Sequence, residues 1–529
     1  MEVVCDDLIT THSCSLRKIS ASNPNSVGLY PYPWPLMNRT ASGILPLITI
    51  DRRLGKPIHR QIYDGYRNAI VNGSLRPNQQ VPSTRVAATE LGISRFPVLN
   101  AYAQLLEEGY FEAKVGVGTV VCKSLPDHVH FGRSVNAKLE QHRSGPRQVA
   151  KRTLTLPTYK RSPWLAGSGA FSVGQVAFDQ FPLHIWSALV NRNCRNMTAR
   201  SFLYGDAMGS LRLREAIANY LRTSRAVRCT ADQIMIVGGS QEALDISATV
   251  LFDPGNSIWV EEPGYRFGTD AFALAGCNLV PIPVDENGLN VATGIERCPM
   301  ARAAIITPSH QFPLGFTMSA QRRLQLLNWA AANGSWIIED DYDSEYRYDC
   351  SPIASLQGLD VNERVLYVGT FSKVLFPSLR LGYIVIPQDL VDRFVTVRHA
   401  IGVASPSLHQ EVLADFIIEG HFARHIRRMR THYSGRRDLL VTSIREEFGS
   451  HATVVGSAAG MYLTMTLPKG TDDRSIARQA ASESLWVWPL STTYLGGRAL
   501  PGFILGFGST SAKDIPKAVR RLRNLMNPK

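Results

Sequence analysis

Residues 370–383, TFSKVLFPSLRLGY, follow an apolar run and combine side chains with a specific chemistry. Lys373 comes three residues after the end of the strand-like run RVLYVGT and close to residues with hydroxyl groups, and Arg380 stands seven residues further on. A lysine that reacts with an aldehyde must be uncharged, so it has to be kept from bulk water. Thr370, Ser372 and Arg380 can converge on a phosphate, to which arginine donates paired hydrogen bonds. The stretch therefore predicts a reactive lysine beside a phosphate pocket.

Two further segments carry side chains that suit the same pocket. Asp340 stands at the end of the run WIIEDD and Tyr342 follows it, so a carboxylate and a phenol can contact the nitrogen and the hydroxyl oxygen of a heteroaromatic ring. In VGGSQEALD a glycine turn precedes an expected helix, where the backbone N–H groups of Ser240 and Gln241 can hold phosphate.

The second half of the chain alternates strand-like runs with turns or amphipathic segments. Six runs show this pattern: QIMIVGG, SIWVEEP, RAAIITPS, SWIIEDD, RVLYVGT and LGYIVIP. Such alternation is typical of an α/β domain built on a mostly parallel sheet. We expect this domain to occupy residues 171–529.

These segments, in this order, resemble the fold-type I aminotransferases, which depend on pyridoxal 5′-phosphate (PLP). The resemblance implies that Lys373 forms an aldimine with PLP, that Asp340 binds the pyridine nitrogen and that Tyr342 contacts the 3′-oxygen. It also implies that Tyr265 in EEPGYRF covers the ring face, and that Tyr204 in SFLYGD reaches the phosphate held by the neighbouring subunit. The expected assembly is therefore a homodimer.

The N-terminal part has the pattern of a short helical domain. Pro57 starts an amphipathic segment that Asn72-Gly73 ends, and Ser83 and Ser94 can cap a second and a third helix. The segment YFEAKVGVGTVVC then predicts two short strands around a glycine-rich tip. The third helix has apolar residues at helical spacing: Val98, Ala101, Tyr102 and Leu105.

This arrangement resembles the winged helix-turn-helix of the GntR family of bacterial regulators. The resemblance implies contacts with DNA from Arg85, Ser94, Arg95, Gly116 and Thr119. Arginine suits this role because its planar fork can grip a phosphate or the N7 and O6 atoms of guanine. The family usually has SRNTV at the start of the reading helix, whereas this chain has SRFPV. Phe96 and Pro97 cannot donate the same hydrogen bonds, so the base preference does not carry over.

The chain is long and basic, with 529 residues and a formal net charge of +13. Nine lysines or arginines face two acidic residues between Lys123 and Arg161, a net charge of +7. Such a stretch is either a solvated linker or a tether that contacts phosphates. We therefore predict a disordered leader over residues 1–43, the DNA-binding domain over 44–122, a basic linker over 123–170 and the PLP-binding domain over 171–529.

Several alternatives are disfavoured by composition. No uninterrupted apolar run is long enough to cross a bilayer, and the start MEVVCDD is acidic where a secretory signal is basic. The eight cysteines form no CxxC pair and the histidines no cluster at metal spacing, which argues against a metal site and a disulfide framework. These features predict a cytoplasmic protein without a membrane span.

A GntR-like module followed by an aminotransferase-like domain resembles the MocR subfamily of regulators, as do the spellings DDYDSE, SHQFPLG and FSKxLxPSLR. The resemblance implies a regulator that binds double-stranded promoter DNA and senses PLP or a small amino compound through Lys373. The alternative is an active PLP-dependent aminotransferase with an appended DNA-binding module.

Three sequence features bear on the choice between a regulator and an active aminotransferase, and on the effector. Phe312 in FPLG stands where many aminotransferases have an asparagine that bonds the 3′-oxygen, so Tyr342 makes that contact alone or with help from a residue that the sequence does not identify. The segment ALPGFILGFGS has no arginine to hold a substrate carboxylate, although Arg266, Arg498 or a binding mode that uses the cofactor alone could substitute. Phe267 stands where regulators responsive to γ-aminobutyrate have arginine, which makes that compound a poor effector candidate.

Overall fold

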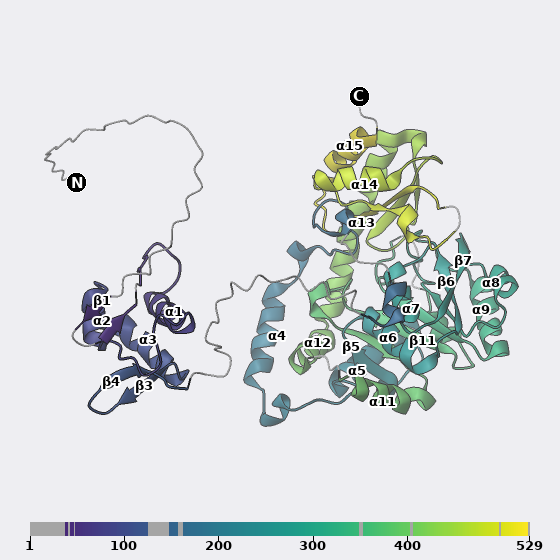
Figure 1. Ribbon diagram of the computed structural model, residues 1–529. Helices are drawn as coiled ribbons and strands as arrows, with labels where there is room; N and C mark the ends of the chain where they lie inside the picture. The colour runs from purple at the N-terminus through teal and green to yellow at the C-terminus, as the bar shows by residue number, and fades with distance from the viewer. Residues whose placement is uncertain are drawn as a thin grey trace, which may run out of the picture. The chain divides into compact units, whose positions relative to one another are not determined.

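The structure is a computed structural model. It describes residues 38–40, 43–46, 48–124, 148–156, 162–348, 353–402, 406–496 and 499–526. Most of the predicted leader and residues 125–147 of the predicted linker lie outside this part of the chain. The chain divides into two compact units, residues 1–147 and 148–529, and each is described by itself (Figure 1).

The first unit is built on three helices and a β-hairpin. Its elements are α1 (Ile58–Val71), α2 (Thr84–Glu90), α3 (Arg95–Glu107), β3 (Phe111–Lys114) and β4 (Gly118–Val121). The predicted start and stop signals of α1 are confirmed, with Pro57 before it and Asn72 after it. The Ser83 hydroxyl accepts a hydrogen bond from the backbone N–H of Val86 at the start of α2. Ser94 occupies the N-cap position of α3, but its side chain makes no capping hydrogen bond.

The core of the first unit contains the predicted apolar face of α3. Val98, Ala101, Tyr102 and Leu105 are all buried. The rings of Tyr66, Tyr102 and Phe111 meet edge to face, with centroids 5.2–5.3 Å apart, and the hydroxyls of Tyr66 and Tyr102 are 2.7 Å apart. This aromatic cluster ties α1 and α3 to the first strand of the wing.

Two short segments differ from the predicted division of the chain. Strands β1 (Asn38–Thr40) and β2 (Gly43–Leu45) form an antiparallel hairpin that crosses the predicted boundary at residue 43. Leu45 packs into the helical core, so this hairpin belongs to the first unit. The 3₁₀ turn η1 (Lys151–Thr155) falls within the predicted linker but contacts α7 (Arg266–Leu274), so it belongs to the second unit.

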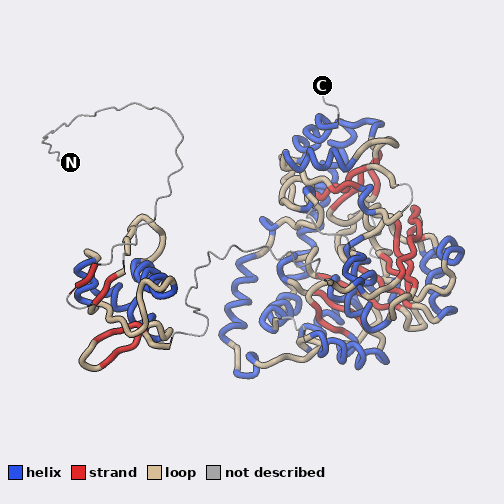
Figure 2. The backbone as a smooth tube through the Cα atoms, in the orientation of Figure 1, coloured by secondary structure: helices blue, strands red, loops and turns tan. Residues whose placement is uncertain are grey.

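The second unit contains an eight-stranded sheet enclosed by helices (Figure 2). The strand order is β5-β12-β11-β10-β9-β6-β7-β8. The strands are β5 (Ile234–Val237), β6 (Ser257–Glu262), β7 (Asn278–Asp285), β8 (Gly288–Leu289), β9 (Ala303–Ile306), β10 (Trp336–Asp341), β11 (Val365–Thr370) and β12 (Gly382–Val385). All six predicted strands are present, and β6, β7, β9, β10 and β11 run parallel wherever they pair with one another.

Helices cover both faces of this sheet. One face packs against α6 (Ser240–Leu251), α7 and α11 (Val391–Ile401). The other packs against α5 (Leu211–Arg225) and α12 (Ser407–Ile418) at one end, and α8 (Val291–Arg297) and α9 (Ala320–Asn333) at the other. Both faces are apolar because alternate residues of each central strand point to opposite helix layers.

The prediction of a mostly parallel sheet is confirmed with two exceptions. Strand β12 is antiparallel to both of its neighbours, and the short β8 is antiparallel to β7. Only residues 371–381 connect β11 to β12, which is too short for the helical crossover that a parallel pair needs. This short connection carries Lys373.

A smaller antiparallel sheet lies near the C-terminus, in the order β13-β14-β16-β15. Its strands are β13 (Thr453–Val455), β14 (Tyr462–Thr466), β15 (Trp488–Pro489) and β16 (Gly502–Gly506). The remaining helices are α4 (Leu183–Arg195), α10 (Leu356–Leu359), the long α13 (His421–Phe448), α14 (Asp473–Ser482) and α15 (Ile515–Met526). Among the described helices, none is both long enough and apolar enough to span a membrane.

Candidate cofactor site and DNA-reading helix

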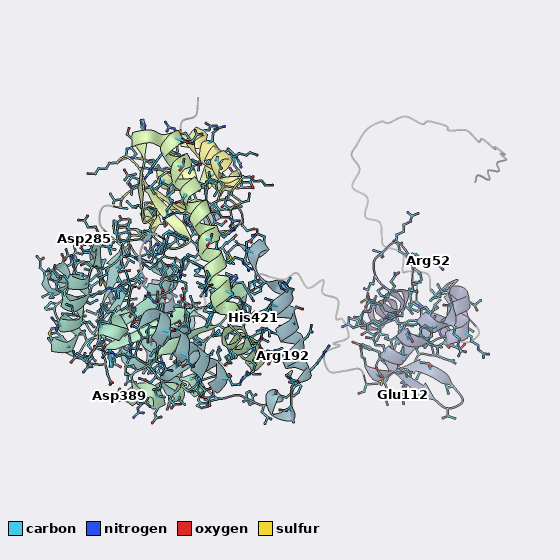
Figure 3. The ribbon with its side chains drawn as sticks, turned by 180° about the vertical axis from the view of Figure 1, so that it is seen from behind. Arg52, Glu112, Arg192, Asp285, Asp389 and His421 are labelled. Atoms are coloured by element: carbon cyan, nitrogen blue, oxygen red, sulfur yellow. The ribbon has the colours of Figure 1, made fainter. Side chains whose placement is uncertain are left out.

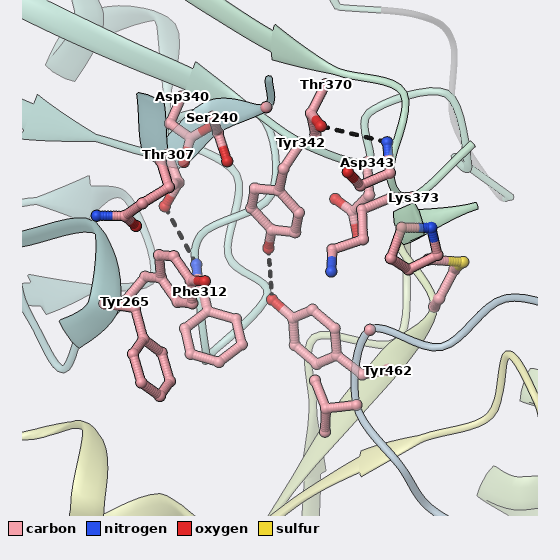
Figure 4. A pocket seen from close by; sticks show the side chains of 18 of the residues that line it. Ser240, Tyr265, Thr307, Phe312, Asp340, Tyr342, Asp343, Thr370, Lys373 and Tyr462 are labelled. Atoms are coloured by element: carbon pink, nitrogen blue, oxygen red, sulfur yellow. Dashed lines mark hydrogen bonds between the residues drawn. The ribbon is translucent and has the colours of Figure 1, made fainter. Parts of the chain in front are cut away.

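A cavity of about 300 Å³ lies in the second unit at the carboxyl ends of β10 and β11 (Figure 4). It collects nine residues that the sequence singled out: Ser240, Gln241, Tyr265, Asp340, Tyr342, Thr370, Ser372, Lys373 and Arg380. Ligands commonly bind at this edge of α/β sheets, because the loops that follow the strands meet there.

Lys373 lies in the short connection between β11 and β12. Burial lowers the pKa of its amine, while Asp343 and Asp340 act in the opposite direction. A methyl group added to Gly174 would come within 2.7 Å of the Lys373 Nζ atom, and Gly174 has a left-handed backbone with φ of +80°. The chain therefore approaches the amine closely at a position that favours glycine.

Asp340 lies in β10, with its side chain inside the cavity wall. It is 6% exposed, and its Oδ1 atom has no hydrogen-bond partner among the described residues. Burial raises the pKa of this carboxyl to about 7, and Asp341 adds to the rise. An unsatisfied buried carboxyl oxygen is costly, so the site fits a ligand that brings a hydrogen-bond donor or a positive charge.

Tyr342 forms a hydrogen-bonded pair with a second phenol. The Tyr342 hydroxyl lies 2.7 Å from the hydroxyl of Tyr462, which reaches the cavity from β14 (Figure 4). The Tyr342 hydroxyl also donates to the His310 carbonyl at 2.8 Å. Burial holds the pKa of both phenols well above the ordinary range. His310 is in turn fixed by Asp343, whose Oδ1 atom is 2.9 Å from Nδ1.

The start of α6 forms the opposite end of the cavity. Gly239 precedes the helix with φ of +122°, and a methyl group there would lie 3.5 Å from the Arg380 guanidinium. The free N–H groups at the start of α6, the arginine and the Ser372 side chain thus surround one space. Glu242, in the first turn of this helix, is paired with Arg398. The set is suited to a phosphate group.

Aromatic rings line the cavity beyond Lys373. Tyr265 lies next to Phe267 and Phe312, with ring centroids 5.7 and 5.6 Å away. Trp488 contacts Phe312 at 5.4 Å, and Phe312 also contacts Tyr462 at 5.4 Å. An apolar wall of this kind excludes water from the space between the lysine and the rings.

Two residues named from the sequence, Tyr204 and Arg266, do not line this cavity. Tyr204 is fully exposed on the loop before α5 and does not line it. Arg266 donates to the Tyr494 carbonyl at 3.1 Å, and Arg498 lies outside the described residues. The cationic residues among those that line the cavity are Lys373 and Arg380.

The lining residues that the sequence reasoning missed include Val173, Gly174, Thr307, Asp343, Met461, Tyr462 and Trp488. Asp343 stood in the quoted segment DDYDSE, and its place after a predicted strand was a signal that could have found it. Tyr462 and Met461 come from the small sheet, whose position over the cavity has no local sequence signal. The described residues contain no group of three histidine, cysteine or acidic side chains placed to hold a metal ion.

The first unit exposes the residues expected at DNA. Arg85 on α2 and Ser94 and Arg95 at the start of α3 are exposed, and the Arg95 Nε atom donates to the Thr84 hydroxyl at 3.0 Å. In the wing, Gly116 is exposed with φ of +80°, and Thr119 is half-buried on β4.

The two units match two different families. Residues 58–121 match the bacterial regulatory proteins of the gntR family, and residues 170–522 match aminotransferase class I and II. An archaeal alanine:glyoxylate aminotransferase has the same fold as the second unit, with a TM-score of 0.67 and 25% identity over 72% of this chain and 98% of that enzyme. The fold and the site thus define a GntR-type DNA-binding domain joined to a class I/II aminotransferase domain.

Relatives with the same two-part organisation share most of the chain's length. The protein named "Probable rhizopine catabolism regulatory protein MocR" of Rhizobium meliloti is 38% identical over 90% of this chain and 95% of its own length. The "HTH-type pyridoxine biosynthesis transcriptional regulator PdxR" of Corynebacterium glutamicum is 29% identical over 85% of this chain and 92% of its own. The chain belongs to the MocR subfamily of GntR-type transcriptional regulators.

Proposed function

We propose that this cytoplasmic regulator binds promoter DNA as a homodimer, holds PLP in the cavity of the second unit, and responds there to PLP or to a small amino compound. The observation that carries the proposal is the convergence of Lys373, Asp340, Tyr342 and the anion-binding start of α6 in one cavity. The same chain carries the GntR-type domain.

The residues that line the cavity fit the parts of PLP one by one. Asp340 would hold the pyridine nitrogen, Tyr342 the ring hydroxyl oxygen, and Tyr265 would cover the ring face. Ser240, Gln241, Thr370, Ser372 and Arg380 would hold the phosphate. The Tyr342–Tyr462 pair supplies a second phenol beside the position where Phe312 replaces the usual asparagine.

When bound, PLP supplies an aldehyde that reacts reversibly with primary amines. Lys373 is prepared for this chemistry because burial lowers the pKa of its amine, and the neutral form is the nucleophile. Asp340, once ionised, stabilises a positive charge on the ring nitrogen. The aromatic wall excludes water and offers an apolar surface to the body of an incoming amine.

The homodimer is supported by an exposed apolar segment next to α5. Phe202, Leu203 and Tyr204 are 77, 70 and 103% exposed, and Leu211 at the start of α5 is 51% exposed. Three consecutive exposed apolar side chains of this size suggest an interaction surface. Tyr204 would then reach the phosphate of the neighbouring subunit, which explains why it lies outside its own cavity.

Two observations favour regulation over multiple-turnover transamination. The chain shares its two-unit organisation with proteins named as regulators. Arg380 is the one arginine among the described residues that line the cavity, and the proposal assigns it to the phosphate and not to a substrate carboxylate. The name of the Corynebacterium relative, a pyridoxine biosynthesis regulator, supports PLP itself as the effector. The aromatic wall supports an amino compound.

Absorbance and DNA capture test the proposal together. We expect the purified protein to gain a visible absorption band with PLP, and this band to change with one member of a panel of primary amines. Lys373→Ala should lose the band, whereas Lys469→Ala, at an exposed lysine, should keep it. The wild-type protein should also retain specific genomic fragments. A protein that stays colourless with PLP, or that retains no fragment, would overturn the proposal.

A further inference from the structure

The exposed face of α3 begins with an apolar residue that the core does not need. Phe96, the second residue of the helix, is 70% exposed, and Leu99 on the next turn is 40% exposed. The buried face of α3 is already complete with Val98, Ala101, Tyr102 and Leu105. Phe96 therefore contributes little to folding and is free to contact a partner.

Charge is distributed unequally along this helix. A groove at its start is lined by Arg52 and Lys56 together with Ser94 and Pro97, and Arg95 follows directly. Two adjacent glutamates, Glu107 and Glu108, mark its other end. In the first unit Arg52 and Glu112 lie at opposite ends (Figure 3). Because DNA is a polyanion, only the first turns of α3 are complementary to it.

We propose that Phe96 is a specificity-determining residue that reads thymine by packing against the 5-methyl group in the major groove. This inference rests on the proposed DNA-binding function. The thymine methyl is the apolar group among the base edges of that groove, and a phenyl ring makes no competing hydrogen bond there. Pro97 has no N–H, so the next residue also donates nothing to a base or a phosphate.

The geometry of the neighbouring side chains supports this assignment. The Arg95 Nε atom donates to the hydroxyl of Thr84 on α2, so the residue before Phe96 is held in place and remains exposed for a phosphate contact, which leaves the exposed phenyl ring for base edges. Leu99 extends the apolar surface by one turn. The reading surface is thus an apolar patch framed by cations, and not a row of hydrogen-bond donors.

A methyl-deletion experiment tests the inference with the full-length protein. A randomised duplex library is selected on the wild-type protein, and each thymine of the selected duplex is replaced in turn by uracil, which lacks only the methyl group. Affinities are measured by fluorescence anisotropy for the wild type, for Phe96→Ala and for Leu106→Ala. Leu106 is a matched control, because it is 38% exposed on the same helix at the glutamate end.

We expect uracil at one or two positions to weaken wild-type binding about fourfold, the effect of one buried methyl group. Phe96→Ala should bind the thymine and uracil duplexes equally, and Leu106→Ala should behave as the wild type. Equal wild-type affinity for every uracil duplex, or an unchanged uracil effect in Phe96→Ala, would overturn this inference alone. Failure to select any duplex would instead overturn the proposed function. Thermal unfolding of each variant confirms that the domain is folded.

Discussion

Lys373 owes its environment to a glycine that approaches it from a distant part of the chain. A methyl group on residue 174 would lie 2.7 Å from Nζ, and the left-handed φ of +80° adds backbone strain. We therefore expect Gly174→Ala to displace the lysine and to weaken PLP binding at least tenfold, measured by titration of the visible band. Gly255→Ala, where φ is also positive but no atom lies within 4 Å, is the control and should bind PLP normally.

Asp340 makes the stability of the PLP-free protein depend on pH. Burial raises its pKa from the usual range near 4 to about 7, so the folded protein keeps a proton that the unfolded chain releases. Stability present below pH 4 is therefore lost as the pH rises to about 7, by about 4 kcal/mol for three pH units. Asp340→Asn should flatten this slope in urea unfolding, although Glu261, whose pKa is also raised to about 7, keeps part of it.

The control for this experiment is Asp389→Asn, because Asp389 is exposed. Its pH slope should match that of the wild type. Identical slopes for Asp340→Asn and the wild type would show that the buried carboxyl does not hold the proton assigned to it. Saturation with PLP should also flatten the wild-type slope, since the ring nitrogen favours the ionised carboxylate.

For single residues of the cavity, the sequence predicted the side chains near strand ends. It missed the side chains that only tertiary packing brings next to them. Lys373, Asp340 and Ser240 could be found because they respectively follow a recognisable strand, lie at the end of one and begin a helix. Tyr462 and Gly174 could not, since neither their local pattern nor their spacing indicates which strand end they approach. The sequence left open whether Tyr342 acts alone or with a second residue, and for the same reason it could not name Tyr462, which bonds it.

At the scale of elements, a buried ion pair joins α5 to β10. Arg225 donates to Asp341 at 2.8 Å and to the Ser309 hydroxyl at 2.6 Å, and Tyr367 also bonds Asp341. Arg225→Ala leaves a buried carboxylate without its cation, so we expect a loss of about 3–5 kcal/mol in the free energy of unfolding. Arg222→Ala, on the exposed side of the same helix, should change it by less than about 0.5 kcal/mol.

The double variant Arg225→Ala/Asp341→Asn distinguishes charge from packing. If the loss comes from the unpaired carboxylate, the second substitution should recover part of it. A double variant less stable than Arg225→Ala would mean that Asp341 is stabilised by its other partners.

The predicted elements that hold best are those with strong local signals. The three helices of the first unit follow from their caps and apolar spacing, and the six predicted strands of the large sheet follow from apolar runs. Strand β7 was missed because NLVPIPVD contains two prolines, which weaken a strand pattern. The antiparallel direction of β12 follows from the length of its connection and not from its own residues.

At the scale of the whole molecule, the two compact units have separate cores, so damage to one should spare the other. Leu105→Ala empties a fully buried position in the first unit and should destabilise that unit by about 2–5 kcal/mol. We expect DNA binding to weaken while the PLP absorption band is kept. In calorimetry only the transition of the first unit should move, with Leu106→Ala as the exposed control. Equal shifts of all transitions would contradict separate cores.

A regulator of this design works only if occupancy of the cavity changes the affinity for DNA, and the coupling must then be reciprocal. The direct measurement is the Kd for the selected duplex in three states: without PLP, with PLP, and with PLP plus each amine of the panel. We predict that at least one state differs from another by about fivefold or more, and that Lys373→Ala abolishes the difference. The same Kd in all states would contradict the account, even if the protein binds both PLP and DNA.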